Sequence, residues 1–442
     1  MSNKLLTPSS VESLTISVAA RTSPLSRAQV QEVLSELITY FPECSFKPVW
    51  LETTGDQDLK TSLRCLDKTD FFTKEIDCQI LKGQCRIGIH SAKDLPHTLP
   101  RGLTLVAVTK GLDSSDSLVF REGETLETLP TRAKIATSSI RREEMVRSLR
   151  SDLTFLDLRG TIGARLAKLQ AGAADGVVVA ECALIRLNLT HLNRMRLSGE
   201  TSLGQGQLAV VAKESDEEMK VLFSLIDSRP KILYLGLNLP EANIQASYLH
   251  YPIIKIEPRA FTSPDIQEAF SKLPLATHLI FTSQTSVELF FAILDDRAIS
   301  RSVLFDKICI AVGEKTAEAI RRFGVSVQMI PKEETAEGII REIELKNLSK
   351  SHFFWPHSAL SRPLITKYLM ASGHIINEVI LYDTYPRKLQ PHPEGHLFDQ
   401  ILFTSPSTVD AYLGLFGSFP KGKILNAIGP ITHKYLTKRR FL

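Results

Sequence analysis

The first half of the chain alternates short apolar runs with segments whose apolar residues recur at helical spacing. Strand-like runs occupy residues 14–19, 46–51, 85–89, 134–136, 153–158, 176–180 and 208–212. Between the first two of them, residues 26–40 place Val30, Val33 and Leu37 on one face of a predicted helix. This alternation is typical of an α/β fold with a mainly parallel sheet and helices on both faces.

The order of the runs predicts two lobes with a cleft between them. The chain leaves the first lobe near residue 103 and returns through Gly204-Gln205-Gly206 to a last strand at 208–212. We therefore expect periplasmic-binding-protein-like lobes at 1–102 plus 203–229 and at 103–202. Charge and proline in Asp227-Ser228-Arg229-Pro230 mark the predicted end of this first domain, 1–229.

The second half, residues 230–442, contains an internal repeat. The run LIFTSQTSV at 279–287 recurs as ILFTSPSTV at 401–409, and AVGEKT at 311–316 recurs more weakly as AIGPIT at 427–432. Each copy alternates strand and helix, so two copies predict two further α/β lobes built on one plan rather than a solenoid.

The composition of the chain limits the classes of protein to which it could belong. The chain has 442 residues, 43% apolar residues and a net charge of +4, so nothing requires a nucleic-acid or membrane partner. No apolar run reaches the roughly eighteen residues of a membrane span, and the polar N-terminus has no signal core. The six cysteines form no Cys-x-x-Cys pair. We expect a reduced cytoplasmic monomer without a structural metal site.

The segment after the run at 85–89 carries the strongest site signal. It reads Gly88-Ile89-His90-Ser91-Ala92-Lys93-Asp94-Leu95-Pro96, which is typical of the carboxyl end of a buried strand, where ligands gather in open α/β sheets. Lys93 would anchor an anion, and Asp94 would stabilise a cation or move protons. The alternative is a salt bridge at a strand end, or pairing of Asp94 with an arginine.

Several arginines follow predicted strands in the same way. Guanidinium groups bind carboxylates or phosphates in a bidentate manner, and neighbouring helix N-termini add N–H donors. Surface charge is the alternative for each one, and nucleic acid is a competing polyanion that the near-neutral charge and the lack of an aromatic stacking pattern disfavour. The residues are Arg21 ahead of Ser23, Arg141 and Arg142 after Thr137-Ser138-Ser139, Arg159 beside Gly160, and Arg165.

In the second half, hydroxyl groups follow two of the repeated strands. Thr282-Ser283 and Thr404-Ser405 would cap helices, which is a sufficient role for each alone, or would face each other and bind acid groups. Tyr382 lies at a predicted return crossover between the lobes, where a surface tyrosine is the alternative.

Over about residues 15–228 the chain resembles porphobilinogen deaminase (hydroxymethylbilane synthase). The matching stretches, in order, are ARTSPL at 20–25 with Gln29, TGD at 54–56, FTKEI at 72–76, HSAKDLP at 90–96, TSSIRR at 137–142, LRG at 158–160 with Gly163 and Arg165, 184–189 with Arg186, and GQG at 204–206.

This resemblance implies that Asp94 is catalytic, with Lys93 beside it, and stabilises pyrrolic and methylene-pyrrolenine cations during chain growth. It also implies a set of residues that bind the acetate and propionate groups of a dipyrromethane cofactor and of the growing chain. That set is Arg21, Ser23, Lys93, Ser139, Arg141, Arg142, Arg159, Arg165 and Arg186, and Ser91, Thr137, Ser138 and Gly160 lie in the same motifs.

Two departures from the family concern the cofactor. The family has a third domain whose Gly-Gly-Cys loop carries the dipyrromethane, whereas here the pattern ends near Arg229 and no such loop follows. The sequence DKTD at 67–70 replaces a glycine-rich loop that contains a lysine. We therefore expect the third domain to be absent, and no cysteine is identified as the attachment site.

Residues 232–442 resemble uroporphyrinogen-III synthase. The likeness is carried by the two Phe-Thr-Ser turns, residues 311–316, Ile330-Pro331 with TAEG at 335–338, and Tyr382 with Thr384. It implies two α/β lobes around a cleft, and a role for Tyr382 in dehydration and ring closure with inversion of the last pyrrole. The family continues beyond the second glycine-containing turn, so we expect a C-terminally clipped lobe.

Together these features give one main hypothesis and two alternatives. The main hypothesis is a bifunctional enzyme, transferase and lyase, that condenses four porphobilinogen units to a linear tetrapyrrole with release of ammonia and cyclises the product to uroporphyrinogen III. The first alternative is a non-catalytic or partner-dependent tetrapyrrole-binding protein, because the cofactor cysteine is missing. The second is a two-lobed solute-binding protein, which would need a secretion signal.

Overall fold

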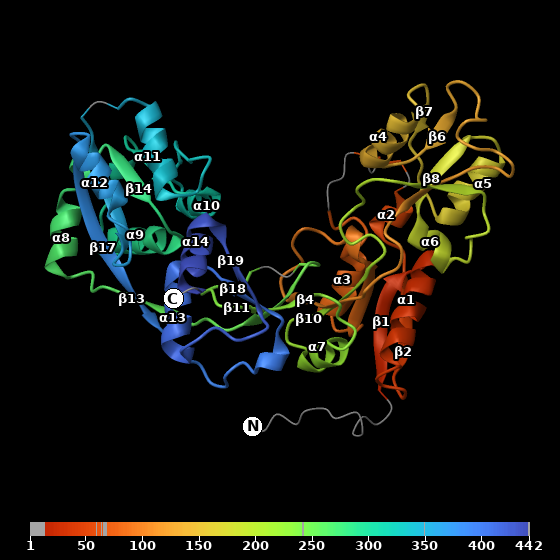
Figure 1. Ribbon diagram of the computed structural model, residues 1–442, viewed down its shortest axis with the longest axis horizontal. Helices are drawn as coiled ribbons and strands as arrows, with labels where there is room; N and C mark the ends of the chain where they lie inside the picture. The colour runs from red at the N-terminus through yellow and green to blue at the C-terminus, as the bar shows by residue number, and fades with distance from the viewer. Residues whose placement is uncertain are drawn as a thin grey trace. The chain divides into compact units, whose positions relative to one another are not determined.

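The computed structural model describes residues 14–58, 60–62, 64, 69–240, 243–348 and 350–440, and they form two compact units (Figure 1). The first runs through Lys231 and includes Pro240–Tyr248, and the second contains Ile232–Leu239 and the chain from Leu249 onward. The predicted boundary at 229/230 thus misses a returning segment. The segment Pro240–Tyr248 is held to the first unit because Arg229 Nη1 donates to the Asn243 carbonyl at 3.0 Å.

The first lobe of the first unit is built on a five-stranded sheet in which one strand runs against the others. Helices α1 (Pro24–Leu37) and α7 (Glu217–Phe223) cover one face, and α3 (Lys74–Leu81) covers the other. β10 is antiparallel to both of its neighbours. The strand order is β2 (Ser45–Leu51), β1 (Thr15–Arg21), β3 (Ile87–Ser91), β10 (Leu208–Lys213) and β4 (Leu103–Val108).

The second lobe repeats this plan. Its antiparallel strand again lies fourth, and α4 (Ile140–Leu149) packs on one face while α5 (Ile162–Gln170) and α6 (Glu181–Arg186) pack on the other. The order is β7 (Thr154–Leu156), β6 (Lys134–Ala136), β8 (Gly176–Ala180), β5 (Asp116–Val119) and β9 (Arg194–Leu197). In each lobe the antiparallel strand is the one through which the chain arrives from the other lobe (Figure 1).

The predicted start of the second lobe at residue 103 is wrong. Residues 103–108 form β4, which pairs with β10 in the first lobe, and their side chains Leu103, Leu105 and Val108 join Ala209 and Val211 in one core cluster. The first crossover between the lobes is therefore residues 109–115, and the second is residues 198–207.

The second unit contains two sheets. Helices α8 (Pro264–Ser271), α9 (Gln284–Asp296) and α10 (Glu314–Arg322) pack on one face of the larger sheet, and α11 (Ala336–Leu345) and α12 (Leu364–Ala371) on the other. Its strand order is β13 (Ile254–Pro258), β17 (Ile375–Pro386), β16 (His352–Ser358), β14 (His278–Phe281) and β15 (Ile308–Ala311). The smaller sheet packs against α13 (Pro406–Phe416) and α14 (Gly429–Arg440), with the order β12 (Ser247–His250), β11 (Lys231–Tyr234), β18 (Gln400–Phe403) and β19 (Ile424–Ala427).

The internal repeat is a structural one. Ser283 and Ser405 both precede a helix with φ of −160°, and each side chain accepts a hydrogen bond from the backbone N–H three residues later, at 3.0 Å from Ser286 and 3.4 Å from Thr408. The repeated Phe-Thr-Ser sequence therefore encodes the same strand–cap–helix turn twice.

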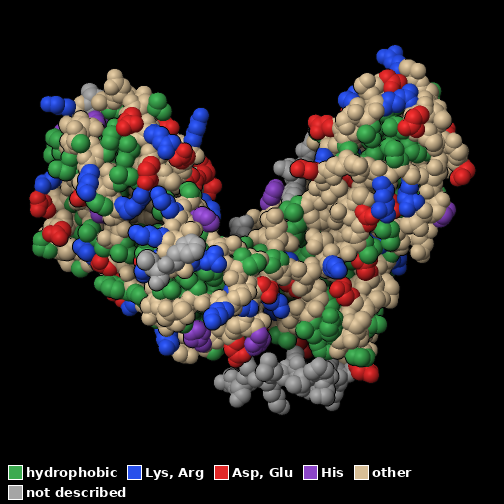
Figure 2. Space-filling model, in the orientation of Figure 1, with side chains coloured by type: hydrophobic (Ala, Val, Ile, Leu, Met, Phe, Trp, Pro, Cys, Tyr) green, Lys and Arg blue, Asp and Glu red, His purple; other side chains and the backbone are tan. Residues whose placement is uncertain are grey.

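Two surface properties bear on possible partners. None of the helices in the described ranges is both long and apolar enough to span a bilayer. On the face seen in Figure 2, positive and negative side chains are interspersed on both units, so no patch of a single sign covers either one there.

Candidate functional site

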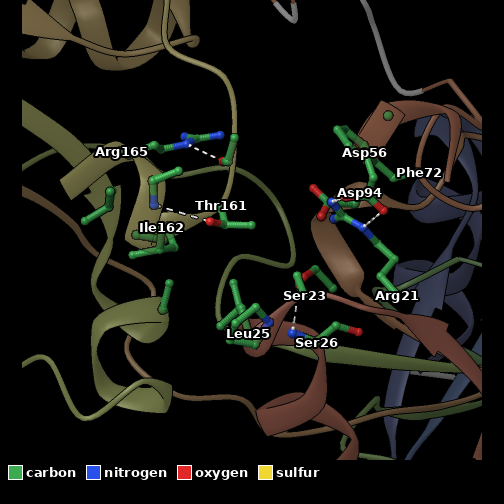
Figure 3. Close-up of a pocket in the computed structure, with 18 of the residues that line it drawn as sticks. Arg21, Ser23, Leu25, Ser26, Asp56, Phe72, Asp94, Thr161, Ile162 and Arg165 are labelled. Carbon is green, nitrogen blue, oxygen red and sulfur yellow. Dashed lines mark hydrogen bonds and ion pairs between the residues drawn. The ribbon is translucent and has the colours of Figure 1, made fainter. Parts of the chain in front are cut away.

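A cavity of about 550 Å³ lies between the two lobes of the first unit (Figure 3). This volume is within the range of small-molecule sites. The first lobe contributes Arg21, Ser23, Ser91, Lys93 and Asp94 to its lining. The second lobe contributes Ser138, Ser139, Arg142, Arg159, Gly160 and Arg165.

The ends of strands and the starts of helices place these residues at the cavity. β1 ends at Arg21, and Ser23 then caps α1 by accepting the Ser26 N–H at 3.2 Å, with Pro24 at the first helical position. On the opposite wall Thr161 caps α5 by accepting the Ala164 N–H at 3.3 Å. Figure 3 shows Thr161 and Arg165 on one side of the opening, with Arg21, Asp56 and Asp94 on the other.

The turn that bears Lys93 and Asp94 is a short 3-10 helix, Ala92–Asp94, directly after β3. Ser91 is held at its start because Gln29 Nε2 donates to its hydroxyl at 2.9 Å. Lys93 Nζ donates to Gln205 Oε1 at 3.3 Å. Burial and the charge of Arg142 lower the pKa of Lys93, while Asp94 opposes that shift. The turn thus presents an ammonium and a carboxylate to one cavity.

Arg21 is already paired on its own wall. Its guanidinium donates to both carboxylate oxygens of Asp56 and lies over the Phe72 ring, 4.6 Å from the centroid. Burial acts to raise the pKa of Asp56, but the Arg21 hydrogen bonds and charge bring it below its ordinary value. Among the described residues, Asp56 is therefore the anion that balances Arg21.

Arg159 makes hydrogen bonds to neutral acceptors across the two lobes. Its guanidinium donates to the carbonyl oxygens of Gly55, Asp58 and Thr61, each at 2.9 Å. The next residue, Gly160, has φ of +107°, a conformation that favours glycine, and its carbonyl accepts from Arg165 Nε at 2.9 Å. Among the described residues no carboxylate lies within ion-pair distance of Arg159, although the charges of Asp157 and Asp58 act on it from farther away.

Arg165 is the least compensated cation of the cavity. Among the residues that the structure describes, no carboxylate lies within ion-pair distance of it, and its recorded protein partner is the Gly160 carbonyl. Burial, with the charges of Arg142 and Arg159, lowers the pKa of Arg165 to about 10. An anion between the lobes would relieve this repulsion, because it would supply the missing opposite charge.

Two residues outside the predicted site set organise the second-lobe arginines. Asp116, at the start of β5, is fully buried and accepts from Arg141 Nη2 at 2.6 Å and from Arg142 Nη2 at 2.6 Å. Gln205 donates to the same carboxylate at 2.9 Å and accepts from Arg142 at 3.3 Å. Burial acts to raise the pKa of Asp116, but the Arg142 charge and hydrogen bonds keep it below the ordinary value. Asp116 begins β5, a strand that is not among the runs predicted from the sequence, so no strand-end signal pointed to it.

Three predicted site residues do not line the cavity. Arg141 is directed to Asp116 and the Glu200 carbonyl, and Thr137 is buried, with its hydroxyl accepting from the Ser139 N–H at 3.3 Å. Arg186 makes a two-pronged ion pair with Glu32 at 2.7 and 2.8 Å, which ties α6 of the second lobe to α1 of the first.

In the second unit Tyr382 is buried, only 6% exposed, so the alternative of a surface tyrosine is wrong. Its hydroxyl lies 3.0 Å from Ser283 Oγ, and Trp355 Nε1 donates to Thr282 Oγ1 at 3.4 Å. Burial raises the pKa of Tyr382 against the hydrogen bonds of Ser283 and Ser358. Strands β14, β16 and β17 thus bring Thr282, Ser283 and Tyr382 together.

The second hydroxyl pair lies apart from this cluster in the fold. The backbone N–H groups of Thr404 and Ser405 both donate to Thr408 Oγ1 at 3.2 Å, at the start of α13 on the smaller sheet. Their recorded contacts are those of a helix cap, and none of them is to Ser283 or Tyr382.

The described residues contain no cluster of three or more His, Cys, Asp or Glu side chains that could hold a metal ion. The cysteines among them are free, and none lines the cavity: Cys44, Cys78, Cys85, Cys182 and Cys309. The sixth, Cys65, lies outside the described residues.

Comparison with known families assigns both units. Residues 16–221 match the family "porphobilinogen deaminase, dipyromethane cofactor binding domain", and residues 242–441 match "uroporphyrinogen-III synthase HemD". A probable porphobilinogen deaminase from Chlamydia pneumoniae is 38% identical over 209 residues, which is 47% of this chain and 88% of that protein. The porphobilinogen deaminase of Ruthia magnifica is 36% identical over 217 residues, 48% of this chain and 71% of that one.

Solved structures with some likeness to the chain include two uroporphyrinogen-III synthases. A mutant of the Thermus thermophilus enzyme is 15% identical with a TM-score of 0.35, covering 47% of this chain and 88% of that one. The Helicobacter pylori protein is 18% identical with a TM-score of 0.34, covering 48% and 89%.

The chemistry of the cavity fits a dipyrromethane. That group carries acetate and propionate arms, and the cavity offers Arg165, which has no described carboxylate within ion-pair distance, Arg159 on neutral carbonyls, and Lys93. The deaminase match, the relatives and the cavity agree: residues 242–441 match the HemD uroporphyrinogen-III synthase model, and the chain belongs to the porphobilinogen deaminase family through residues 16–221.

Proposed function

We propose that the first unit condenses four porphobilinogen units to a linear tetrapyrrole with release of ammonia, and that the second unit cyclises this product to uroporphyrinogen III. The observation that carries the proposal is the uncompensated Arg165, which lines the same cavity as the carboxylate of Asp94. A polyanionic substrate whose reacting centre becomes positively charged would use both.

Each reacting group has a partner in this scheme. Porphobilinogen carries two carboxylate arms and an aminomethyl group, and departure of ammonia leaves a carbon whose positive charge is shared with the pyrrole nitrogen. Asp94 would stabilise that charge at the N–H, because a carboxylate in a cavity interacts more strongly than one in water. Arg165 and Lys93 would hold the carboxylate arms, with Ser23 and Ser139 adding hydroxyl donors.

The dipyrromethane, when bound, supplies the pyrrole position from which a chain is extended. Arg142, Arg159 and Arg165 on the second lobe would hold its acid arms, while Asp94 on the first lobe would face the incoming unit. Gln205 would keep Lys93 and Arg142 in place, since its side-chain oxygen accepts from both at 3.3 Å.

In the second unit, we propose that Tyr382 assists loss of water from the hydroxymethyl end of the linear tetrapyrrole. Its buried hydroxyl would donate a proton to the departing hydroxyl group, and Ser283 would orient it. Thr282 would be positioned by Trp355.

The two lobes of the first unit support a further description, that of periplasmic-binding-protein-like lobes. Both sheets place an antiparallel strand fourth, and two crossovers join them beside the cavity. Such an arrangement would allow the lobes to close on a bound chain of pyrroles.

One assay tests both activities. The purified full-length chain is incubated with porphobilinogen, ammonia is measured, and the oxidised products are resolved into uroporphyrins I and III. We expect type III from the wild type, no product from Asp94→Ala, and a shift to type I from Tyr382→Phe, because an unassisted linear product closes without inversion. Turnover by Asp94→Ala would remove that carboxylate from the chemistry.

The alternative is a tetrapyrrole-binding protein that does not turn over alone, favoured by the observation that none of the described cysteines lines the cavity. The intact mass distinguishes the two. A mass increase of one dipyrromethane supports the enzyme, whereas an unmodified chain that releases no ammonia but binds the linear tetrapyrrole supports the alternative.

A further inference from the structure

A buried acid and a buried base face each other behind the wall of the cavity. His90 Nε2 and Asp77 Oδ1 are 3.6 Å apart, and their side chains are 3% and 2% exposed. Within the described part of the chain, neither this nitrogen nor either carboxylate oxygen of Asp77 has a hydrogen-bond partner of good geometry, and the Thr73 hydroxyl, which also acts on Asp77, is unpartnered as well. Unsatisfied buried polar groups are costly and rare, so two that face each other at this distance indicate a bond that forms in one protonation state or another.

The local sequence builds the space for this pair. Gly88 and His90 lie on the face of β3 that α3 covers, and a Cβ on Gly88 would lie 2.7 Å from Ile76 Cγ2 and 3.1 Å from His90 Nε2. The glycine therefore lets α3 approach the strand closely enough to bring Asp77 to the imidazole. The motif GIHSAKD at 88–94 thus supplies the histidine of the pair and the glycine that makes room for α3, as well as the turn of Lys93 and Asp94.

The surroundings decide which atom carries the proton. Burial raises the pKa of Asp77 to about 6; the Thr73 hydroxyl opposes this shift, and the charges of Asp70 and Glu75 add to it. Burial, with the charge of Arg21, lowers the pKa of His90 to about 4. These shifts favour a carboxylate beside a neutral imidazole at pH 7 and two neutral groups between about pH 4 and 6.

These two states reverse the hydrogen bond. A carboxylate at position 77 requires Nε2–H as its donor, whereas a carboxylic acid donates its own O–H to a bare Nε2. One proton taken from water near pH 6 therefore ends on Asp77, while the imidazole proton passes to Nδ1. The charged groups that act on the pair are Arg21 at the end of β1, Asp70 ahead of α3 and Glu75 in its first turn.

The pair joins two parts of the cavity wall. His90 is followed by Ser91 and then by the turn of Lys93 and Asp94, whereas α3 follows Phe71 and Phe72. The Phe72 ring supports Arg21, and Arg159 lies 5.6 Å from the Phe71 centroid. A change in the hydrogen bond between His90 on β3 and Asp77 on α3 would therefore change the spacing between the Lys93–Asp94 turn and the Phe71–Phe72 segment.

We propose that Asp77 and His90 form a reversible hydrogen-bonded couple that positions the Lys93–Asp94 turn against the Phe71–Phe72 wall, as positioning residues for the condensation proposed above. The role is distinct from catalysis, because neither side chain lines the cavity. Only the expected effect of the couple on turnover rests on the proposed function. The proton exchange between Asp77 and His90 is measurable without substrate.

The first test follows the imidazole in full-length chain labelled with ¹⁵N-histidine, with His90 assigned by His90→Gln. We expect a neutral ring from pH 8 to 5, with the proton on Nε2 at high pH and on Nδ1 at low pH, and a midpoint near pH 6. Asp77→Asn should abolish the exchange. The control Asp70→Asn removes a neighbouring charge and should move the midpoint to lower pH while keeping the exchange. An imidazolium at pH 7, or an unchanged tautomer across the range, would overturn the proposal.

The second test measures coupling to the turn. The Ala92 N–H donates to the Gln207 carbonyl at 3.0 Å, so its ¹⁵N-alanine signal reports the turn directly. We expect the Ala92 signal to shift with the midpoint that His90 shows in the same protein, which is near pH 6 in the wild type and lower in Asp70→Asn. The shift should be lost in Asp77→Asn or, if that variant does not fold, in His90→Gln. A flat Ala92 signal beside a switching His90 would refute the positioning role. If the chain is active, kcat rather than KM should change with the same midpoint as the His90 exchange. If the wild type is inactive but shows both the His90 exchange and the Ala92 shift, only the proposed condensation is refuted.

Discussion

Replacing Arg165 by methionine should stabilise the ligand-free protein, which is unusual for a residue in a binding cavity. The fall of the Arg165 pKa from 12.5 to about 10 corresponds to about 3 kcal/mol against the charged form at roughly 1.4 kcal/mol per unit. Loss of the hydrogen bond from Nε to the Gly160 carbonyl offsets about 1 kcal/mol of that. Because the side chain is still partly open to water, we expect a net gain of about 1–2 kcal/mol.

Calorimetric unfolding of chain whose intact mass shows no adduct measures this gain. For a unit of this size, 1 kcal/mol shifts the melting temperature by about 2–4 °C, so the variant should melt roughly 2–8 °C higher than the wild type. Added porphobilinogen should raise the melting temperature of the wild type with concentration but should raise that of Arg165→Met far less. The control is Arg147→Met, which removes an exposed guanidinium paired with Glu143 on α4 and should change stability by less than about 0.5 kcal/mol.

A lower melting temperature for Arg165→Met, together with unchanged stabilisation by porphobilinogen, would refute the reasoning. It would mean that the guanidinium is satisfied within the protein and is not the cation that the ligand neutralises.

Three further predictions concern the frame of the cavity. Asp116→Asn should lower the urea-measured unfolding free energy by about 3 kcal/mol at pH 7, because two arginines lose a buried partner. Since folding lowers the pKa of Asp116 from 3.8, the stability that Asp116 contributes is complete above pH 3.8 and disappears as the pH falls through the folded pKa. A difference between variant and wild type that persists at low pH would contradict this prediction. Glu32→Gln and Arg186→Met should show a coupling energy of about 1–3 kcal/mol in a double-mutant cycle, and additive effects would mean that the two-pronged pair contributes nothing. Gly160→Ala should cost about 1–3 kcal/mol in the same urea assay because of its φ of +107°, and an unchanged midpoint would show that the turn relaxes.

Local sequence predicted the elements of the first unit well where both ends carried a signal. The strands expected at 134–136 and 176–180 match β6 and β8 residue for residue. The first helix was predicted at 26–40 but spans Pro24–Leu37, because Ser23 and Pro24 form a capped start two residues earlier. The lobe assignment of β4 was wrong since its apolar pattern would suit either sheet, and only pairing with β10, about a hundred residues later, decides it.

The candidate site was likewise predictable in part. Residue type and position at strand ends predicted which side chains would reach the cavity rim, as for Arg21, Asp94 and Arg165. Which guanidinium would remain uncompensated was not predictable, because the answer depends on acids supplied from elsewhere. Glu32 is 154 positions from the arginine it neutralises, and Asp116 is 25 positions from Arg141.

Strand β10 lies between β3 and β4, and this has a consequence for biosynthesis. The sheet beneath the Lys93–Asp94 turn stays incomplete until residues 208–213 have left the ribosome, by which time the whole inserted lobe, residues 109–207, has been translated. At about 5–20 residues per second, the nascent chain keeps an open β3 edge for several seconds or more. Within the first unit, the sheet beneath the Lys93–Asp94 turn is thus the last to be completed, and until then chaperones that shield unpaired strands could bind the edge of β3.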